Sequence, residues 1–205
     1  MDTKIKLLFE TILFEHGKPQ NIRYHQKRVT KSAKELFGIE IDFDMYRLRC
    51  DDDTKPHRCK VAYSDRGIES VEFLPYVKKP IKKLKAVFGD DISYGYKFLD
   101  RGGLDTLFAQ KGGCDDVIII KDGLLTDTSI ANIALIGDDG IWVTPKTPLL
   151  RGTARERLLD ERKIVERDIE CTDLFNYRKI ALMNALRGFE IVGSTKEVIE
   201  LGDIG

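Results

Sequence analysis

The sequence lacks a long hydrophobic run, and this absence bounds where the protein works. No apolar stretch approaches the roughly 20 residues that a helix needs to cross a bilayer. The N-terminal MDTKIKLLFETILFEHG has too short an apolar segment for a signal peptide and no small-residue cleavage site. We therefore expect a soluble, cytoplasmic protein that has no membrane partner.

Net charge is also absent, because Lys and Arg together number 34 and so do Asp and Glu. No global electrostatic field therefore favours nucleic acid or an anionic surface. One segment, VKKPIKKLKAV, carries five lysines and a proline but no interleaved aromatic residues. A nucleic-acid patch there is conceivable, but the composition favours a solvated connector between two parts of the chain.

Cysteine and histidine are few and scattered. The four cysteines form no CxxC pair, and the three histidines form no HxH or HxxxH pattern. A metal site is therefore not predicted. A disulfide framework is improbable at this length, so we expect reduced, structural cysteines.

What the chain does have is enough apolar sequence for one ample core or two small ones, since 42% of its 205 residues are hydrophobic. With the lysine-rich segment as the connector, we expect a small N-terminal lobe over residues 1–80 and a larger lobe over residues 81–205. Both should be α+β.

The N-terminal part has clear signals for secondary structure. Two apolar runs flank the His16-Gly17-Lys18-Pro19 turn, which is typical of a β-hairpin. Apolar residues at helical spacing predict a helix over residues 25–37, with Gly38 as its stop. A second short helix in FDMYRLRC and two strands, in HRCKVAYSDRG and IESVEFLPYV, follow.

The C-terminal part alternates hairpins with short helices. RGGLDTLFAQKGG predicts a helix, and Asp122-Gly123 and Asp139-Gly140 predict hairpin turns. Another helix should begin at Gly152-Thr153, and strand-like pieces complete the chain. This α+β pattern has little βαβ alternation, which argues against a doubly wound sheet.

Three features between residues 97 and 154 carry chemistry. Lys97 lies in SYGYKFLDR, Asp127 lies at a strand end in DGLLTDTSIAN, and PLLRGTARERLL opens a helix. Backbone N–H groups in the last two turns could hold a phosphate. An amine, an acid and phosphate-binding turns suit a phosphorylated carbonyl cofactor held as a Schiff base.

The order of six motifs resembles a known family. LFET, HxxR, K-x-L-x-R, DGLxTDTSxAN, TPxxPLLxGTxR and NALRG, spread over nearly the whole chain, resemble the class IV (fold type IV) aminotransferase family. KFLDR and NALRG are most similar to its aminodeoxychorismate lyase branch. The resemblance implies a two-lobed fold like that of D-amino acid aminotransferase, pyridoxal 5'-phosphate as cofactor, a small-molecule amine substrate and a homodimer. It also implies a shortened N-terminus, since the chain begins almost at LFET.

The resemblance implies roles for three residues at the cofactor. Lys97, expected in the larger lobe, would form the Schiff base and act as general base and acid. Arg28, in YHQKR, would clamp the phosphate with its guanidinium fork. Asp127 stands where the family usually has a glutamate that pairs with the pyridine nitrogen. Because aspartate is one methylene shorter, either the ring shifts or the contact loosens.

The phosphate's remaining partners would be Thr128 and Ser129 in one turn and Thr153 and Ala154 at the helix opening. Many relatives have threonine where this chain has Ala154, so Thr153 would have to supply any hydroxyl. Asn132 would support the first turn.

Substrate-side roles fall on Glu10, Arg66 and Arg101. Strand alternation puts Glu10 and Thr11 on opposite faces, so only one of them can point into the site. Arg101 lies four residues after Lys97, one turn away if that segment is helical. Arg66 and Arg101 could equally be surface ion-pair partners.

Three functions remain open from the sequence. The first is 4-amino-4-deoxychorismate lyase, which eliminates pyruvate to leave 4-aminobenzoate for folate synthesis. The second is transfer of the amino group of a branched-chain or D-amino acid to a 2-oxo acid. The third is a non-catalytic relative, towards which the Asp127 and Ala154 departures point and against which Lys97 and Arg28 count.

Overall fold

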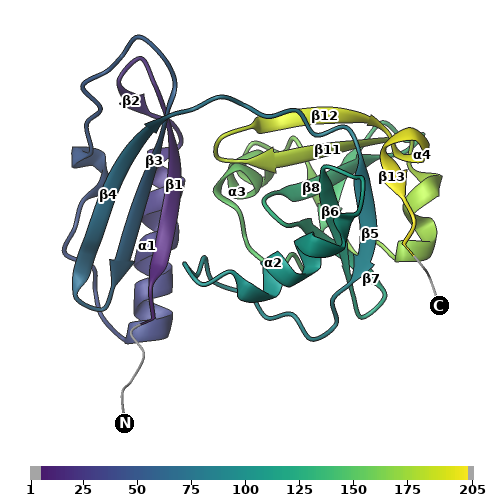
Figure 1. Cartoon of the computed structure of the whole chain (residues 1–205), viewed down its shortest axis with the longest axis horizontal. Coiled ribbons are helices and arrows are strands. Elements are labelled where there is room, and N and C mark those ends of the chain that lie inside the picture. Colours follow the sequence, from purple (N-terminus) through teal and green to yellow (C-terminus); the bar gives the residue numbers. More distant parts are fainter. Residues whose placement is uncertain (1–5, 203–205) are drawn as a thin grey trace. The chain divides into compact units, whose positions relative to one another are not determined.

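The computed structural model of the chain describes residues 6–202, which form two compact units (Figure 1). The first unit comprises the described residues up to Lys78 together with Tyr96–Asp100, and the second comprises Lys79–Gly95 and the residues from Arg101 onward. The expected lobes were 1–80 and 81–205, with Lys97 in the second. In the structure Lys97 belongs to the first unit, because its carbonyl accepts a hydrogen bond from Phe9 N at 2.9 Å.

The first unit is a four-stranded antiparallel sheet, in the order β2-β1-β3-β4, with a helix packed against one face. Its elements are β1 (Leu8–Glu15), β2 (Lys18–Pro19), α1 (Ile22–Phe37), the short 3-10 helix η1 (Met45–Arg47), β3 (His57–Ser64) and β4 (Gly67–Pro75). The predicted hairpin and long helix are confirmed, and the second short helix is a single 3-10 turn. His16 and Gly17 both have positive φ, as the tight turn between β1 and β2 requires.

The core of this unit follows from alternation along β1. Leu8, Ile12 and Phe14 lie on one face of the strand and pack with Val29 of α1. Glu10 lies on the same face, and its side chain is fully buried. The one charged residue in this alternating series therefore points into the layer between sheet and helix.

The second unit is built on a nine-stranded mixed sheet. The main path runs β10-β9-β8-β7-β6-β5-β13, and β11 pairs with both β8 and β12. The strands are β5 (Leu84–Phe88), β6 (Asp116–Lys121), β7 (Leu124–Thr128), β8 (Asn132–Ile136), β9 (Trp142–Pro145), β10 (Val165–Arg167), β11 (Lys179–Asn184), β12 (Gly188–Ser194) and β13 (Ile199–Glu200). The helices are α2 (Gly102–Phe108), η2 (Ala109–Lys111), α3 (Thr153–Asp160), η3 (Cys171–Asn176) and α4 (Thr195–Val198).

The lysine-rich connector is not wholly solvated, contrary to expectation. Its second half is β5, in which Leu84 and Ala86 are buried in the core of the second unit. β5 pairs in parallel with β6, and β9 pairs in parallel with β10, so two of the connections cross over through helices. The rest of the sheet is formed largely by antiparallel hairpins, and the α+β class is confirmed.

Within residues 6–202, no helix is both long and apolar enough for a bilayer span. The same residues contain no group of three or more His, Cys, Asp or Glu side chains that could hold a metal ion.

Candidate functional site

Three side chains meet in the first unit. Glu10 comes from β1, and His25 and Arg28 come from the first turns of α1. Glu10 Oε1 accepts a hydrogen bond from Arg28 Nε at 2.8 Å, and Glu10 Oε2 accepts one from Arg28 Nη2 at 2.6 Å. His25 Nδ1 lies 2.5 Å from Glu10 Oε2. Since His25 and Arg28 are three residues apart on α1, they lie on one face of the helix.

The charge of Glu10 differs from what burial alone would produce, whereas that of His25 does not. Burial raises the pKa of Glu10, but Arg28 and then His25 together lower it by more than burial raises it. The resulting pKa is about 2. Burial is also the main cause of the lowered pKa of His25. The hydrogen bond and charge of Glu10 raise that pKa, but Arg28 and Lys97 act with burial and the net shift is downward. Glu10 is therefore an anion at neutral pH, and His25 is a neutral ring that donates through Nδ1.

Lys97 lies in the same unit. A β-bridge between Phe98 and Leu8 and the Phe9 N–H to Lys97 carbonyl bond attach its backbone to β1. Its Nζ lies 4.5 Å from the centre of the Phe9 ring, a cation–π distance. The structure thus gathers Lys97, Arg28 and Glu10 in one unit, although they are up to 87 positions apart in sequence.

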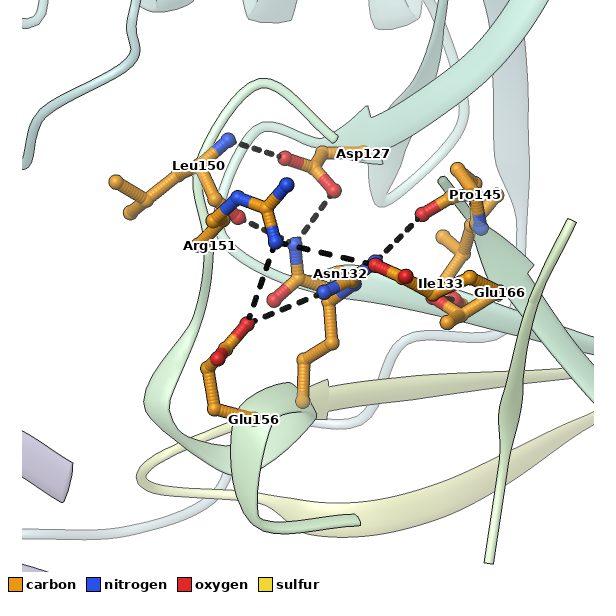
Figure 2. A network of polar contacts seen from close by, with 10 residues as sticks. Asp127, Asn132, Ile133, Pro145, Leu150, Arg151, Glu156 and Glu166 are labelled. Carbon is orange, nitrogen blue, oxygen red and sulfur yellow. Dashed lines mark hydrogen bonds and ion pairs between the residues drawn. The ribbon is translucent and has the colours of Figure 1, made fainter. Parts of the chain in front are cut away.

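Asp127 is the last residue but one of β7 in the second unit, and its carboxyl group belongs to a polar network (Figure 2). Oδ1 accepts a hydrogen bond from Asn132 Nδ2 at 2.6 Å, and Oδ2 accepts one from Leu150 N at 2.9 Å. Burial raises the pKa of Asp127 to about 7, and hydrogen bonds from Leu150 and Asn132 offset only part of that effect. The group can therefore gain or lose a proton near neutral pH.

Asn132 ties this carboxyl group to the loop before α3. Its Nδ2 also donates to the Leu150 carbonyl at 2.7 Å, so one amide holds both Asp127 and the loop. A Cβ at Gly152 would collide with Asn132 Oδ1. The sequence predicted a supporting role for Asn132, whereas Gly152 was expected only as a helix start.

The Thr128-Ser129 turn already uses its backbone donors. Thr128 N donates to the Ala131 carbonyl at 2.8 Å, and Ser129 N donates to Asp116 Oδ1 at 3.3 Å. Asp116 is almost fully buried, and its Oδ2 makes no hydrogen bond to any residue in the described range. Burial raises the pKa of Asp116, with the Ser129 side chain as the largest opposing influence. In this conformation both backbone donors of the turn are therefore in use, and the hydroxyl groups of Thr128 and Ser129 also contact Asp116.

The opening of α3 is the second place where the resemblance expects the phosphate. Glu156 N donates to the Gly152 carbonyl, and the earlier N–H groups of an α-helix have no acceptor within it. Thr153 and Ala154, the two residues expected at the phosphate, occupy these positions and are both buried.

Arg155 anchors this helix opening. Its side chain is fully buried, and Nη2 donates to Glu166 at 2.6 Å and to the Pro145 carbonyl at 2.9 Å. Glu156 and Glu166 also lie near Arg151, so the network joins α3 to β9 and β10 (Figure 2).

The two arginines that were expected on the substrate side lie in different settings. Residues 97–100 are not helical and Arg101 only caps α2, so the one-turn relation to Lys97 does not exist. Arg101 instead donates to the Ser129 carbonyl at 2.9 Å within the second unit. Arg66 lies in the β3–β4 turn of the first unit, exposed and paired with Glu69 at 3.1 Å.

Sequence reasoning did not single out His25, Asp116, Gly152 or Arg155 as contributors to these groups. His25 could have been found from the HxxR spacing, which places both side chains on one helix face. Asp116 and Arg155 carried no such signal, because a polar residue at a strand or helix end is ordinarily solvated.

Comparison with known proteins agrees with the resemblance. Residues 103–194 match the family described as amino-transferase class IV. An uncharacterised protein of Haemophilus influenzae is 40% identical over 186 residues, which cover 88% of this chain and 98% of that protein.

Solved structures show the same fold. A Haemophilus somnus protein, provisionally described as a 4-amino-4-deoxychorismate lyase, is 36% identical with a TM-score of 0.81, over 90% of this chain and 98% of that one. A hypothetical aminotransferase of Mycobacterium tuberculosis, solved with pyridoxal phosphate bound, is 20% identical with a TM-score of 0.76, over 95% and 81% of the two chains. The chain belongs to the class IV aminotransferase family of pyridoxal-phosphate-dependent enzymes.

Proposed function

We propose that this protein is a lyase that eliminates pyruvate from 4-amino-4-deoxychorismate and leaves 4-aminobenzoate. The observation that carries the choice is the 36% identity, over nearly the whole of that chain, to the Haemophilus somnus protein provisionally described with this activity. The NALRG motif supports it. Asn184 of this motif donates to the Ile130 carbonyl at 3.1 Å, which joins the β11–β12 turn to the Thr128–Ala131 turn.

The side chains present suit pyridoxal phosphate. A phosphorylated aldehyde with a basic ring nitrogen needs an amine, a phosphate clamp and a carboxylate acceptor. We propose Lys97 as the amine, Arg28 and the α3 opening at Thr153 and Ala154 as the clamp, and Asp127 as the acceptor. A carboxyl group whose pKa burial has raised to about 7 would be stabilised as an anion by a nearby ring N–H cation.

In the proposed reaction, bound pyridoxal phosphate supplies an electron sink next to the carbon that bears the substrate amine. The Lys97 amine accepts the proton from that carbon. The C–O bond on the neighbouring carbon would then break, and the leaving oxygen would take the proton held by Lys97, so that pyruvate departs as its enol and the ring left behind is aromatic. Asp127 would keep the cofactor nitrogen protonated, and Arg28 would hold the phosphate.

Several finer assignments rest on the family resemblance alone. On this basis we propose a homodimer, a cytoplasmic location and a place in folate synthesis. Thr128 and Ser129 would add hydroxyl groups to the phosphate site, and Arg66 and Arg101 are the residues that the resemblance places towards the substrate.

The first test is the visible spectrum of the protein with added pyridoxal phosphate. We expect a band near roughly 410–430 nm that borohydride removes, because a lysine-bound cofactor is reducible at the C=N bond. Lys97→Ala should lack this band. Lys60→Ala is the matched control, since the Lys60 Nζ also faces the Phe9 ring, at 5.7 Å. If Lys97→Ala retained the reducible band, Lys97 would not be the cofactor lysine.

Product analysis then separates the functions. Pyruvate and 4-aminobenzoate formed without any added oxo acid would support the lyase. Strict dependence on a 2-oxo acid would instead identify an aminotransferase for branched-chain or D-amino acids. A wild-type protein that takes up no cofactor would be a non-catalytic relative, and the proposal would fail.

A further inference from the structure

Glu10 is an anomaly within the first unit. Its neighbours on the same face of β1 are apolar, and its carboxylate is fully buried among them. A buried charge is costly unless it is paired and hydrogen-bonded, and replacing such a pair by apolar residues is often neutral or stabilising. Packing alone therefore gives no reason for a carboxylate at this position.

The contacts of Glu10 are directional. Its two oxygens meet Nε and Nη2 of Arg28 side-on, so the pairing uses two of the five N–H donors of the guanidinium. The remaining donors lie on the other edges of the same rigid plane. The Arg28 side chain is 14% exposed, so its environment is not wholly closed. A side-on carboxylate thus sets the direction in which the outer edge of the guanidinium points.

His25 holds the carboxylate in turn. Its Nδ1–H is the third donor to Glu10, at Oε2, and the ring has no measurable exposure. Arg28 and His25 therefore share one acceptor, and any rotation of the Glu10 carboxylate would break two hydrogen bonds at once. His25 thus fixes the orientation of the Glu10 carboxylate, which in turn fixes the orientation of the Arg28 guanidinium.

We propose that Glu10 is a positioning residue, which with His25 holds the Arg28 guanidinium so that its outer edge receives the cofactor phosphate. The inference rests on the proposed function, because it takes Arg28 as the phosphate clamp. It replaces the expectation that Glu10 faces the substrate, since the side chain points towards α1.

The electrostatics of the group favour orientation over attraction. The Glu10 and Arg28 charges cancel, and His25 is neutral, so the three side chains together add little net field for a dianion. What Arg28 can contribute is therefore a pair of well-aimed, charge-assisted hydrogen bonds. The low pKa of Glu10, about 2, keeps the carboxylate ionised over the whole working range of pH.

The decisive experiment compares two ligands that differ only in the phosphate, pyridoxal phosphate and pyridoxal. Glu10→Gln keeps the shape of the side chain but replaces one accepting oxygen by an amide donor. The visible band reports cofactor binding. We expect the dissociation constant of Glu10→Gln for pyridoxal phosphate to rise by about 10- to 100-fold, because the Arg28 guanidinium would no longer be held in place. The constant for pyridoxal should stay within about twofold. Glu161→Gln, which alters the exposed Arg157–Glu161 pair, is the matched control and should change neither.

A second pair of variants covers the case in which Glu10→Gln does not fold. The amide nitrogen of asparagine can replace a histidine Nδ1–H, whereas that of glutamine extends to the Nε2 position. His25→Asn should therefore keep the wild-type preference for the phosphorylated ligand, and His25→Gln should lose several-fold of it.

The outcomes separate this inference from the proposed function. Equal losses for both ligands would mean a structural role, and no change or tighter binding of pyridoxal phosphate would mean that Glu10 does not position Arg28. Each of these results, in a wild type that binds the cofactor, overturns the inference alone. A wild type without the reducible band overturns both.

Discussion

Glu10 in the first unit and Asp127 in the second are both buried carboxyl groups, yet their pKa values are shifted in opposite directions. The pKa of Glu10 is lowered to about 2, whereas the pKa of Asp127 is raised to about 7. Burial acts the same way on both, so it cannot explain the difference. Glu10 faces an arginine at 2.6 Å, while the hydrogen bonds to Asp127 come from an asparagine side chain and a backbone amide.

The comparison teaches that a cation in direct contact decides the charge state of a buried carboxyl group in this fold. Glu10 has its cation in place and is a fixed anion suited to holding another side chain. Asp127 has only neutral groups in contact, and Arg155 acts on it more weakly. An incoming ring N–H cation would complete its pairing, which is what the proposed cofactor provides.

The largest expected effect comes from removing the Glu10 carboxylate. Glu10→Leu strands the Arg28 charge and the His25 donor, and should cost about 3–5 kcal/mol of unfolding free energy. Urea unfolding of the cofactor-free protein measures it, with Asp138→Leu, in the exposed pair with Arg178, as a control that should match wild type. The double variant Glu10→Leu/Arg28→Leu should recover part of the loss. If it recovers nothing, the stranded charge is not the cause.

Much of the fold could be predicted because local signals were strong. The hairpin turns at His16-Gly17 and Asp122-Gly123 required positive φ, and the sequence supplies residues that tolerate it. The helix with its stop at Gly38 followed from spacing and a left-handed cap. Strand β5 was missed because three lysines between residues 82 and 85 mask the alternation of a short buried strand.

The residues of the candidate site could be predicted from the sequence, but the orientation of their side chains and the unit to which each belongs could not. The motifs singled out Arg28, Lys97 and Asp127, and the resemblance supplied their roles. Alternation left open whether Glu10 or Thr11 faces inward, since that depends on which side of the sheet the helix covers. Lys97 was expected in the wrong unit because a bridge between residues 98 and 8 is a long-range pairing without a local signal.

The second prediction concerns Asp127 and the dependence of the unfolding free energy on pH. A folded-state pKa of about 7, raised from 3.8, means that the folded protein holds a proton which the unfolded chain releases. Its contribution is fully present below pH 3.8 and is lost as pH rises through 7. Between pH 4 and 8, wild type should lose on the order of 3–4 kcal/mol relative to Asp127→Asn. Urea unfolding of both proteins without cofactor, at several pH values, measures this difference.

Glu10 gives an internal comparison in the same experiment, because its stabilising contribution is lost as pH falls, whereas that of Asp127 is lost as pH rises. Its stabilisation is complete above pH 4.5 and is lost as pH falls through 2, so the two groups titrate in separate windows. Other groups, Asp116 among them, are shared by wild type and Asp127→Asn and cancel in the difference. Parallel pH profiles for the two proteins between pH 4 and 8 would show that Asp127 keeps an ordinary pKa.

The smallest expected effect tests the neutral partners of Asp127 without touching the carboxyl group. In Gly152→Ala the new Cβ would displace Asn132 Oδ1, and the Asn132 hydrogen bonds to Asp127 and the Leu150 carbonyl would weaken. A loss of about 1–3 kcal/mol in unfolding free energy should follow, because buried polar groups would lose partners. Gly152 has φ of −72°, a value that alanine adopts readily, so backbone strain does not contribute. Gly113→Ala, with open space around its Cβ, is the control. Equal stability of the two variants would mean that Asn132 moves without cost, and that its hydrogen bonds to Asp127 do not help to hold the loop before α3.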